Sequence, residues 1–131
     1  MNIRIYYEDT DCGGVVYYAN YLRYMERSRT EIMRDAGVEL VELRNETGMQ
    51  FAIVDAHIRY RSPAVYNDLI TLNTSITECS AMTVTFHTDI FNASGKLLVE
   101  GDVKAVCLDK DIKACRMPKT ILEKLKSLKV N

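Results

Sequence analysis

The sequence is poor in the residues on which several kinds of functional site depend. It has no tryptophan, two histidines (His57 and His87) and four cysteines, none of which form a Cys-x-x-Cys pair. Structural zinc sites need four closely spaced Cys or His ligands, so we expect neither a metal site nor a cofactor. The longest uncharged run, residues 12–22, is too short to cross a bilayer and contains Gly13 and Asn20.

The chain also lacks an excess of charge of either sign. Its 17 Lys and Arg residues nearly balance its 18 Asp and Glu residues, which leaves a formal net charge of −1. Such a chain has no overall field to attract nucleic acid or an anionic membrane, so we expect neither nucleic-acid binding nor membrane insertion. An anionic ligand would need a local cluster of basic side chains. Because no signal peptide is recognisable at Met1, we expect reduced cysteines and a cytoplasmic location.

The length and the hydrophobic pattern predict one α+β domain over residues 1–131. Residues 3–8 resemble a short strand, and residues 18–36 have the spacing of a helix that ends at Gly37. The predicted inner face of this helix consists of Leu22, Met25, Arg29, Ile32, Met33 and Ala36. Residues 38–50 read as a polar connection with one short helical turn, and a second helix is expected after Pro118.

Between these helices, apolar residues recur at every second position, which is typical of strands with one buried face. The predicted inward sets are Val54, Ala56, Ile58 and Tyr60; Ile70, Leu72, Thr74 and Ile76; Met82, Val84, Phe86, Thr88 and Ile90; and Leu97, Val99, Gly101, Val103, Ala105 and Cys107. Four such strands in a row predict an antiparallel meander that curves around the long helix. The exposed edges and outer face of this sheet favour dimerisation, edge to edge or sheet against sheet.

The segment between the first strand and the long helix combines features suited to acyl transfer. Residues 8–21 hold the acids Asp9 and Asp11 and the glycine pair Gly13-Gly14, and they lead into a helix start. Free N–H groups at a helix start stabilise a carbonyl oxygen that gains negative charge, and a nearby carboxylate can attack that carbonyl or activate water. The same residues also fit a simple helix cap and turn. A calcium loop is excluded, because Gly13 and Asn20 occupy positions where ligands are needed.

Residues 7–22, YEDTDCGGVVYYANYL, resemble the signature of the 4-hydroxybenzoyl-CoA thioesterase family of hotdog proteins. The similarity is greatest to the bacterial acyl-CoA thioesterases associated with the Tol–Pal system. Residues 24–31 (YMERSRTE), residues 60–64 (YRSPA) with Asp68-Leu69, and residues 116–118 (RMP) also match that branch. The resemblance runs along nearly the whole chain and implies a hotdog fold, with a curved antiparallel sheet around one long helix and a short C-terminal helix.

The resemblance also implies roles for individual residues. By motif position, Asp11 is the catalytic carboxylate, as nucleophile or general base, and the backbone N–H of Tyr18 polarises the thioester carbonyl. Gly14 and Val15 fall in the part of the motif that binds substrate. Cys12 and Tyr18 depart from the family pattern, since relatives commonly carry a histidine at the position of Tyr18. A backbone donor survives that change.

The implied substrate is an acyl-CoA or an acyl-carrier-protein thioester, and the implied assembly is a homodimer or a tetramer formed from two dimers. Arg59, Arg61 and Arg116 are candidates for contacts with the phosphates of the carrier, although a solvated strand face explains Arg59 and Arg61 equally well. The main alternative function is a non-catalytic acyl-CoA or acyl-carrier-protein sensor. A hotdog dehydratase is disfavoured, because no histidine occurs between Met1 and Asp55.

Overall fold

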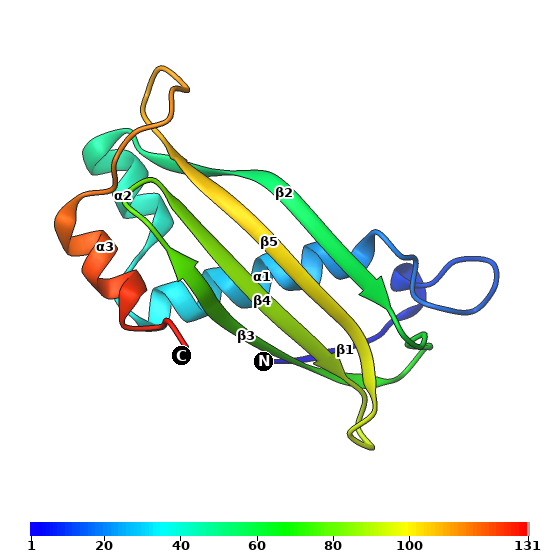
Figure 1. Ribbon diagram of the computed structural model, residues 1–131. Helices are drawn as coiled ribbons and strands as arrows, with labels where there is room; N and C mark the ends of the chain where they lie inside the picture. The colour runs from blue at the N-terminus through cyan, green and yellow to red at the C-terminus, as the bar shows by residue number, and fades with distance from the viewer. Residues whose placement is uncertain (131) are drawn as a thin grey trace.

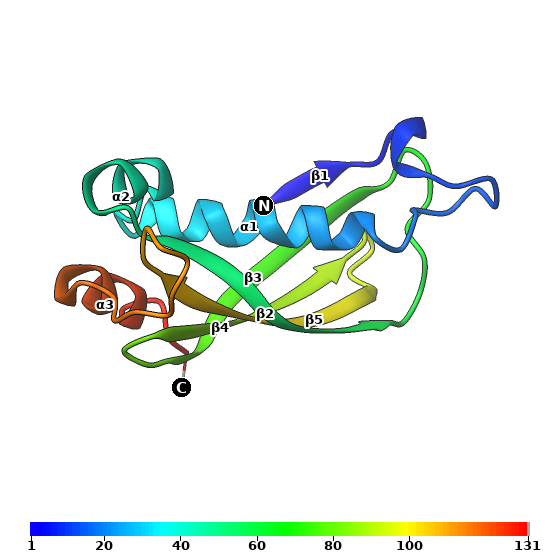
Figure 2. The same ribbon diagram turned by 90° about the horizontal axis from the view of Figure 1, so that it is seen from above.

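The computed structural model describes residues 1–130 and confirms the α+β class. The elements in chain order are β1 (Asn2–Arg4), the short 3-10 turn η1 (Tyr7–Asp9), α1 (Asn20–Asp35), α2 (Leu40–Thr47), β2 (Gln50–Tyr60), β3 (Leu69–Cys79), β4 (Thr83–Phe91), β5 (Leu97–Leu108) and α3 (Lys119–Lys126). A curved sheet wraps around α1, with α2 and α3 gathered near the C-terminal end of α1 (Figures 1 and 2).

The five strands form one antiparallel sheet in the order β1-β3-β4-β5-β2. The predicted meander is confirmed for β3, β4 and β5 but is wrong for β2, which pairs with β5 and not with β3. Residues 61–68 carry the chain from the edge strand β2 to β3, which lies next to the opposite edge strand β1. As the chain leaves β2, the N–H groups of Arg61 and Ser62 both donate to the Leu98 carbonyl. Periodicity reports which face of a strand is buried, not which strand lies beside it.

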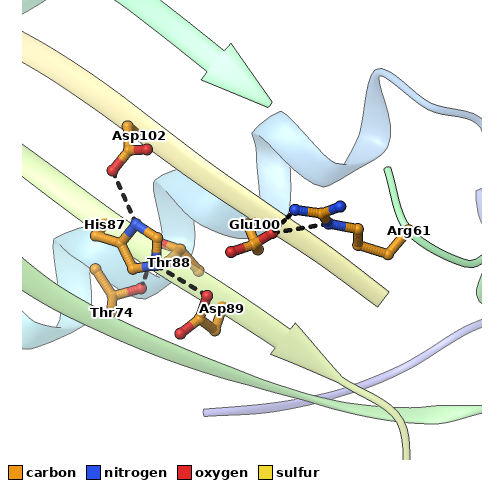
Figure 3. A network of polar contacts seen from close by, with 7 residues as sticks. All are labelled: Arg61, Thr74, His87, Thr88, Asp89, Glu100 and Asp102. Atoms are coloured by element: carbon orange, nitrogen blue, oxygen red, sulfur yellow. Dashed lines mark hydrogen bonds and ion pairs between the residues drawn. The ribbon is translucent and has the colours of Figure 1, made fainter. Parts of the chain in front are cut away.

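The buried face of α1 differs in part from the predicted one. Leu22 is 42% exposed, whereas Tyr21, Tyr24 and Ser28 are buried against the sheet. The hydroxyl of Ser28 lies 2.6 Å from that of Thr74. The Thr74 hydroxyl in turn lies 2.8 Å from that of Thr88 (Figure 3). Because these polar atoms find partners inside the molecule, burial does not leave them unsatisfied. A helix face predicted from apolar residues alone omits a buried polar residue such as Ser28.

The side chain of Met25 on α1 lies directly over Gly101 of β5. A β-carbon at this position would lie 2.1 Å from the Cε atom of Met25, a distance that excludes any side chain unless Met25 moves. Met25 is itself buried in the core that α1 shares with the sheet. The missing side chain of Gly101 therefore leaves room for the end of the Met25 side chain between α1 and β5.

The edge strand β2 is far more exposed than its alternating sequence predicts. Ile53 is 46% exposed, Val54 58% and Tyr60 48%. The ladder to β5 shifts register between Ile53 and Asp55, so that the alternation breaks at Val54. By register, Ile53 and Tyr60 share the inner face of the sheet with Ala105 and Val99 of β5, yet α1 covers them only in part. The result is an apolar strip along a free sheet edge.

Three predicted boundaries are corrected. The first strand ends at Arg4, and a 3-10 turn occupies part of the range predicted to be extended. The long helix begins at Asn20, later than predicted, and residues 38–50 contain the eight-residue helix α2. The second predicted helix follows Pro118, as expected. Within residues 1–130, no helix has the length and apolar character needed to span a membrane.

Candidate active site

The loop before α1 is anchored by the backbone of Asp9. Its carbonyl oxygen accepts hydrogen bonds from the Tyr17 N–H at 2.9 Å and from the Asn20 side-chain amide at 2.8 Å. The Val16 N–H donates to the Ala64 carbonyl at 2.9 Å, which ties the loop to the connection between β2 and β3. These bonds fix the residues on both sides of Tyr18 and so determine where its peptide lies.

Asp11 lies at the start of a tight turn that projects beyond the end of the sheet (Figures 1 and 2). Its N–H donates to the Val15 carbonyl at 2.9 Å, and its Oδ1 accepts the Gly13 N–H at 2.8 Å. Gly14 has a φ of 82°, a left-handed conformation that glycine adopts without strain. The turn exposes the Asp11 side chain and restrains one of its oxygens.

Tyr18 supplies a free donor next to the start of α1. Its N–H makes no hydrogen bond to any residue in the described part of the chain, whereas its carbonyl oxygen accepts the Tyr60 hydroxyl at 3.1 Å. Because α1 begins at Asn20, this donor lies at the positive end of the helix dipole. An unpaired N–H in this place suits a developing oxyanion.

A cleft of about 250 Å³ opens beside this peptide and is lined by Val16, Tyr18, Tyr21, Tyr60, Arg61, Ser62 and Pro63. The Tyr21 hydroxyl accepts the Ala64 N–H at 3.1 Å, which holds the wall of the cleft in place. The side chain of Asp11 does not line the cleft within the single chain. The pKa of Tyr17, on the same loop, is raised chiefly by the neighbouring Tyr18, with smaller contributions from burial and from the negative charge of Asp11.

The candidate basic residues are separated by the fold. Arg61 lines the cleft, but its Nε and Nη2 atoms lie 2.8 and 2.7 Å from a carboxylate oxygen of Glu100 (Figure 3). Arg59 lies on the outer face of β2, with its Nε 3.3 Å from the His57 Nε2 atom. Arg116 is exposed before α3, at the opposite end of the molecule from the start of α1. The structure therefore groups Asp11, Gly14, Val15, Tyr18 and Arg61 at one end and leaves Arg116 apart.

Two features of the site were not predicted from the sequence. The alternating pattern of β2 places Tyr60 in an inward apolar set. Only the fold shows that its hydroxyl reaches the Tyr18 carbonyl. Asp9 and Asn20 belong to the recognised motif, but their hydrogen bond to each other is a tertiary contact. Among the described residues, no group of three or more His, Cys, Asp or Glu side chains is placed to hold a metal ion.

Comparison with known proteins identifies the family of the chain. Residues 6–125 match the model of the thioesterase-like superfamily. The acyl-CoA thioester hydrolase YbgC of Escherichia coli is 37% identical over 125 residues, covering 95% of this chain and 92% of the relative. The probable thioesterase of Bartonella henselae superposes with a TM-score of 0.85 at 29% identity, covering 90% of this chain and 97% of that one.

The structure of a 4-hydroxybenzoyl-CoA thioesterase superposes with a TM-score of 0.89, covering 95% of this chain and 96% of that chain. At 22% identity, this likeness shows a common fold. Together with the curved antiparallel sheet around α1, it confirms the hotdog fold expected from the sequence. The chain belongs to the thioesterase-like superfamily.

Proposed function

We propose that the protein is an acyl-CoA thioester hydrolase in which Asp11 and the Tyr18 N–H act on the same thioester carbonyl. The family and the relatives support thioester hydrolysis. The observation that carries the assignment of the site is the free N–H of Tyr18 beside the start of α1, on the same loop as an exposed carboxylate. Gly14 and Val15 complete the turn between them and are proposed to contact the substrate.

In the proposed reaction, the carbonyl oxygen of the thioester accepts a hydrogen bond from the Tyr18 N–H. The negative charge that develops on this oxygen is stabilised by the N–H and by the helix dipole. In one route, a carboxylate oxygen of Asp11 attacks the carbonyl carbon, the thiolate leaves, and water hydrolyses the resulting anhydride. In the other, Asp11 takes a proton from a water molecule that attacks the same carbon. Both routes yield a free acid and a free thiol.

Replacing Asp11 with Asn tests this proposal. The variant keeps an oxygen that can accept the Gly13 N–H, so the turn should persist, but the amide is neither a nucleophile nor a base. We expect kcat for acyl-CoA hydrolysis, followed by trapping of the released thiol, to fall by about a thousandfold or more, as in other enzymes that lose the group that starts the reaction. Asp35→Asn, at an exposed position near the end of α1, is the matched control and should keep full activity. Near-normal turnover by Asp11→Asn contradicts the assignment.

The active assembly is proposed to be a homodimer or a pair of dimers. Asp11 does not line the cleft of its own chain, and β2 leaves an apolar edge uncovered, so a second copy placed against that edge would close the cleft. Cytoplasmic acyl-CoA or acyl-carrier-protein thioesters are the proposed substrates. Arg59, Arg61 and Arg116 remain proposed contacts for the carrier, Arg61 less readily because Glu100 neutralises it.

A non-catalytic acyl-CoA sensor is the second candidate, because the carboxylate of Asp11 lies outside the cleft within a single chain. A sensor gains nothing from a carboxylate next to an electrophilic carbonyl, whereas a hydrolase needs one. Steady release of thiol from acyl-CoA by the wild-type protein, lost in Asp11→Asn, would exclude the sensor. Binding of acyl-CoA without any release of thiol would favour it.

A further inference from the structure

A polar hollow on the β1 side of α1 is not part of the cleft beside Tyr18. It has a volume of about 370 Å³, and Arg4, Arg23, Arg27, Glu8 and Asp9 contribute its charged lining. Arg4 comes from β1, whereas Arg23 and Arg27 are one turn apart on α1, on its side facing away from β2. Figure 2 shows β1 and β2 on opposite sides of α1. The fold thus brings arginines that are far apart in the sequence to the rim of one hollow.

These arginines have no carboxylate partner within residues 1–130. The ion pairs in this part of the chain involve Arg34, Arg61 and His87. Of the two acids in the hollow, Asp9 already uses an oxygen to accept the Tyr6 N–H at 2.8 Å. The hollow therefore carries a surplus of positive charge, and its guanidinium groups have donors to spare for an anion.

Two of the arginines are held in place by contacts that leave donors free. One Nη atom of Arg4 donates to the Asn67 carbonyl at 2.8 Å. The guanidinium carbon of Arg27 lies 5.9 Å from the centre of the Tyr24 ring, a cation–π contact that fixes its position without using its hydrogen-bond donors. Because less side-chain freedom is lost on binding, such groups favour a ligand more strongly than free arginines do.

The hollow also adjoins the proposed reaction centre. Asp9 lines it, and the carbonyl of Asp9 holds the Tyr17 N–H and the Asn20 side chain, which flank Tyr18. A molecule with its thioester at the Tyr18 N–H and a long flexible arm could therefore place a distant anionic group here. The forked donors of arginine match the oxygens of a phosphate.

We propose that this arginine hollow, formed by Arg4, Arg23 and Arg27, binds a phosphate ester of the molecule that carries the acyl thioester. The inference rests on the proposed function for the identity of the ligand. A phosphate ester occurs both in the nucleotide part of CoA and at the end of the phosphopantetheine arm of a carrier protein. In both molecules, the group that the arginines would bind is a phosphate ester.

Calorimetric titration of the intact protein with CoA, 4′-phosphopantetheine and pantetheine tests the proposal without any need for hydrolysis. Arg23→Gln is the principal variant, because Arg23 is exposed and its side chain makes no hydrogen bond or ion pair within residues 1–130. Arg27→Gln is the second. Each should weaken CoA binding by about tenfold, the loss expected for one charge-assisted hydrogen bond, and leave pantetheine binding unchanged. Arg44→Gln, on α2, is the matched control and should bind CoA like the wild type.

A parallel loss for 4′-phosphopantetheine would place the phosphate of the pantetheine arm in the hollow, and a loss confined to CoA would place a nucleotide phosphate there. Unchanged CoA affinity in both variants overturns the proposal, as does an equal loss of pantetheine binding or an equal effect of Arg44→Gln. Arginine-dependent binding of CoA by a protein that releases no thiol would contradict the hydrolase and leave the phosphate site standing. Thiol release without arginine-dependent binding of CoA would support the hydrolase and contradict the phosphate site.

Discussion

Tyr60 lies on the exposed edge strand, yet its hydroxyl reaches the peptide that precedes the long helix. The hydrogen bond to the Tyr18 carbonyl is 3.1 Å long, and the two rings meet edge to face with centroids 6.3 Å apart. The carbonyl lies in the peptide that follows Tyr18 and the N–H in the peptide that precedes it, so we expect this bond to limit the backbone rotations that link the two and thereby to help orient the proposed oxyanion donor. We expect Tyr60 to act as a positioning residue through the backbone of Tyr18.

Tyr60→Phe keeps the ring and removes only the hydroxyl. We expect kcat to fall by about tenfold with little change in KM, because the donor would be less well oriented in the transition state, while one hydrogen bond of modest strength is lost. The midpoint of thermal unfolding should stay close to that of the wild type. Tyr66→Phe is the control, since Tyr66 is a similarly exposed tyrosine whose ring stacks on Tyr7. A fall in thermal stability that accounts for the lost activity would argue against the positioning role.

At the scale of elements, strands β4 and β5 are joined on the outer face of the sheet by His87. Its Nδ1 atom lies 2.8 Å from a carboxylate oxygen of Asp102, and its Nε2 atom lies 2.9 Å from one of Asp89 (Figure 3). Burial acts to lower the pKa of His87, but the hydrogen bonds and charges of the two carboxylates outweigh it, so the pKa is raised. Protonated His87 is thus stabilised in the folded chain.

This shift predicts a pH-dependent contribution to stability. Because the pKa is higher in the folded chain, the contribution is fully present below the ordinary histidine pKa of about 6.5 and is lost as pH rises through the raised value. In urea unfolding, wild type should exceed His87→Gln by a few tenths to about 1 kcal/mol at pH 5.5 and by less at pH 9, since the pairs are partly exposed. A gap between wild type and His87→Gln that does not change with pH contradicts the prediction.

The sequence pattern predicts an element correctly where the alternation of apolar and polar residues within that element determines which face is buried. Ile70, Leu72, Val84 and Val103 alternate with polar residues because β3, β4 and β5 each have one face against α1, and that alternation was read correctly. The place of β2 beside β5 was not predictable, because strand pairing depends on contacts far apart in the chain. The motif from Asp11 to Tyr18 is contiguous and could be recognised. The proximity of Arg4 to Arg23 and Arg27 could not be predicted, because it depends on how β1 packs beside α1.

At the scale of the whole molecule, the edge of the sheet formed by β2 remains uncovered in a single chain. Within residues 1–130, the N–H and C=O groups on the outer side of β2 have no neighbouring strand, and Ile53 and Val54 expose apolar surface along that edge. Natural sheets seldom leave such an edge bare. Pairing of β2 with β2 of a second copy about a two-fold axis would satisfy both the backbone and the apolar side chains.

Val54→Asp tests this assembly. Val54 is 58% exposed in the single chain, so the change should not disturb the chain's own core, but it would place like charges from two copies near each other at a desolvated interface. We expect sedimentation to show a dimer or a pair of dimers for the wild type and a shift toward monomer for the variant. Activity per chain should fall in parallel, because the cleft beside Tyr18 would stay open. Val41→Asp, at a 64% exposed position on α2, should change neither property. A fully active wild-type monomer, or an undisturbed oligomer of the Val54→Asp chain, would mean that the cleft is complete without a partner and that the edge has another purpose.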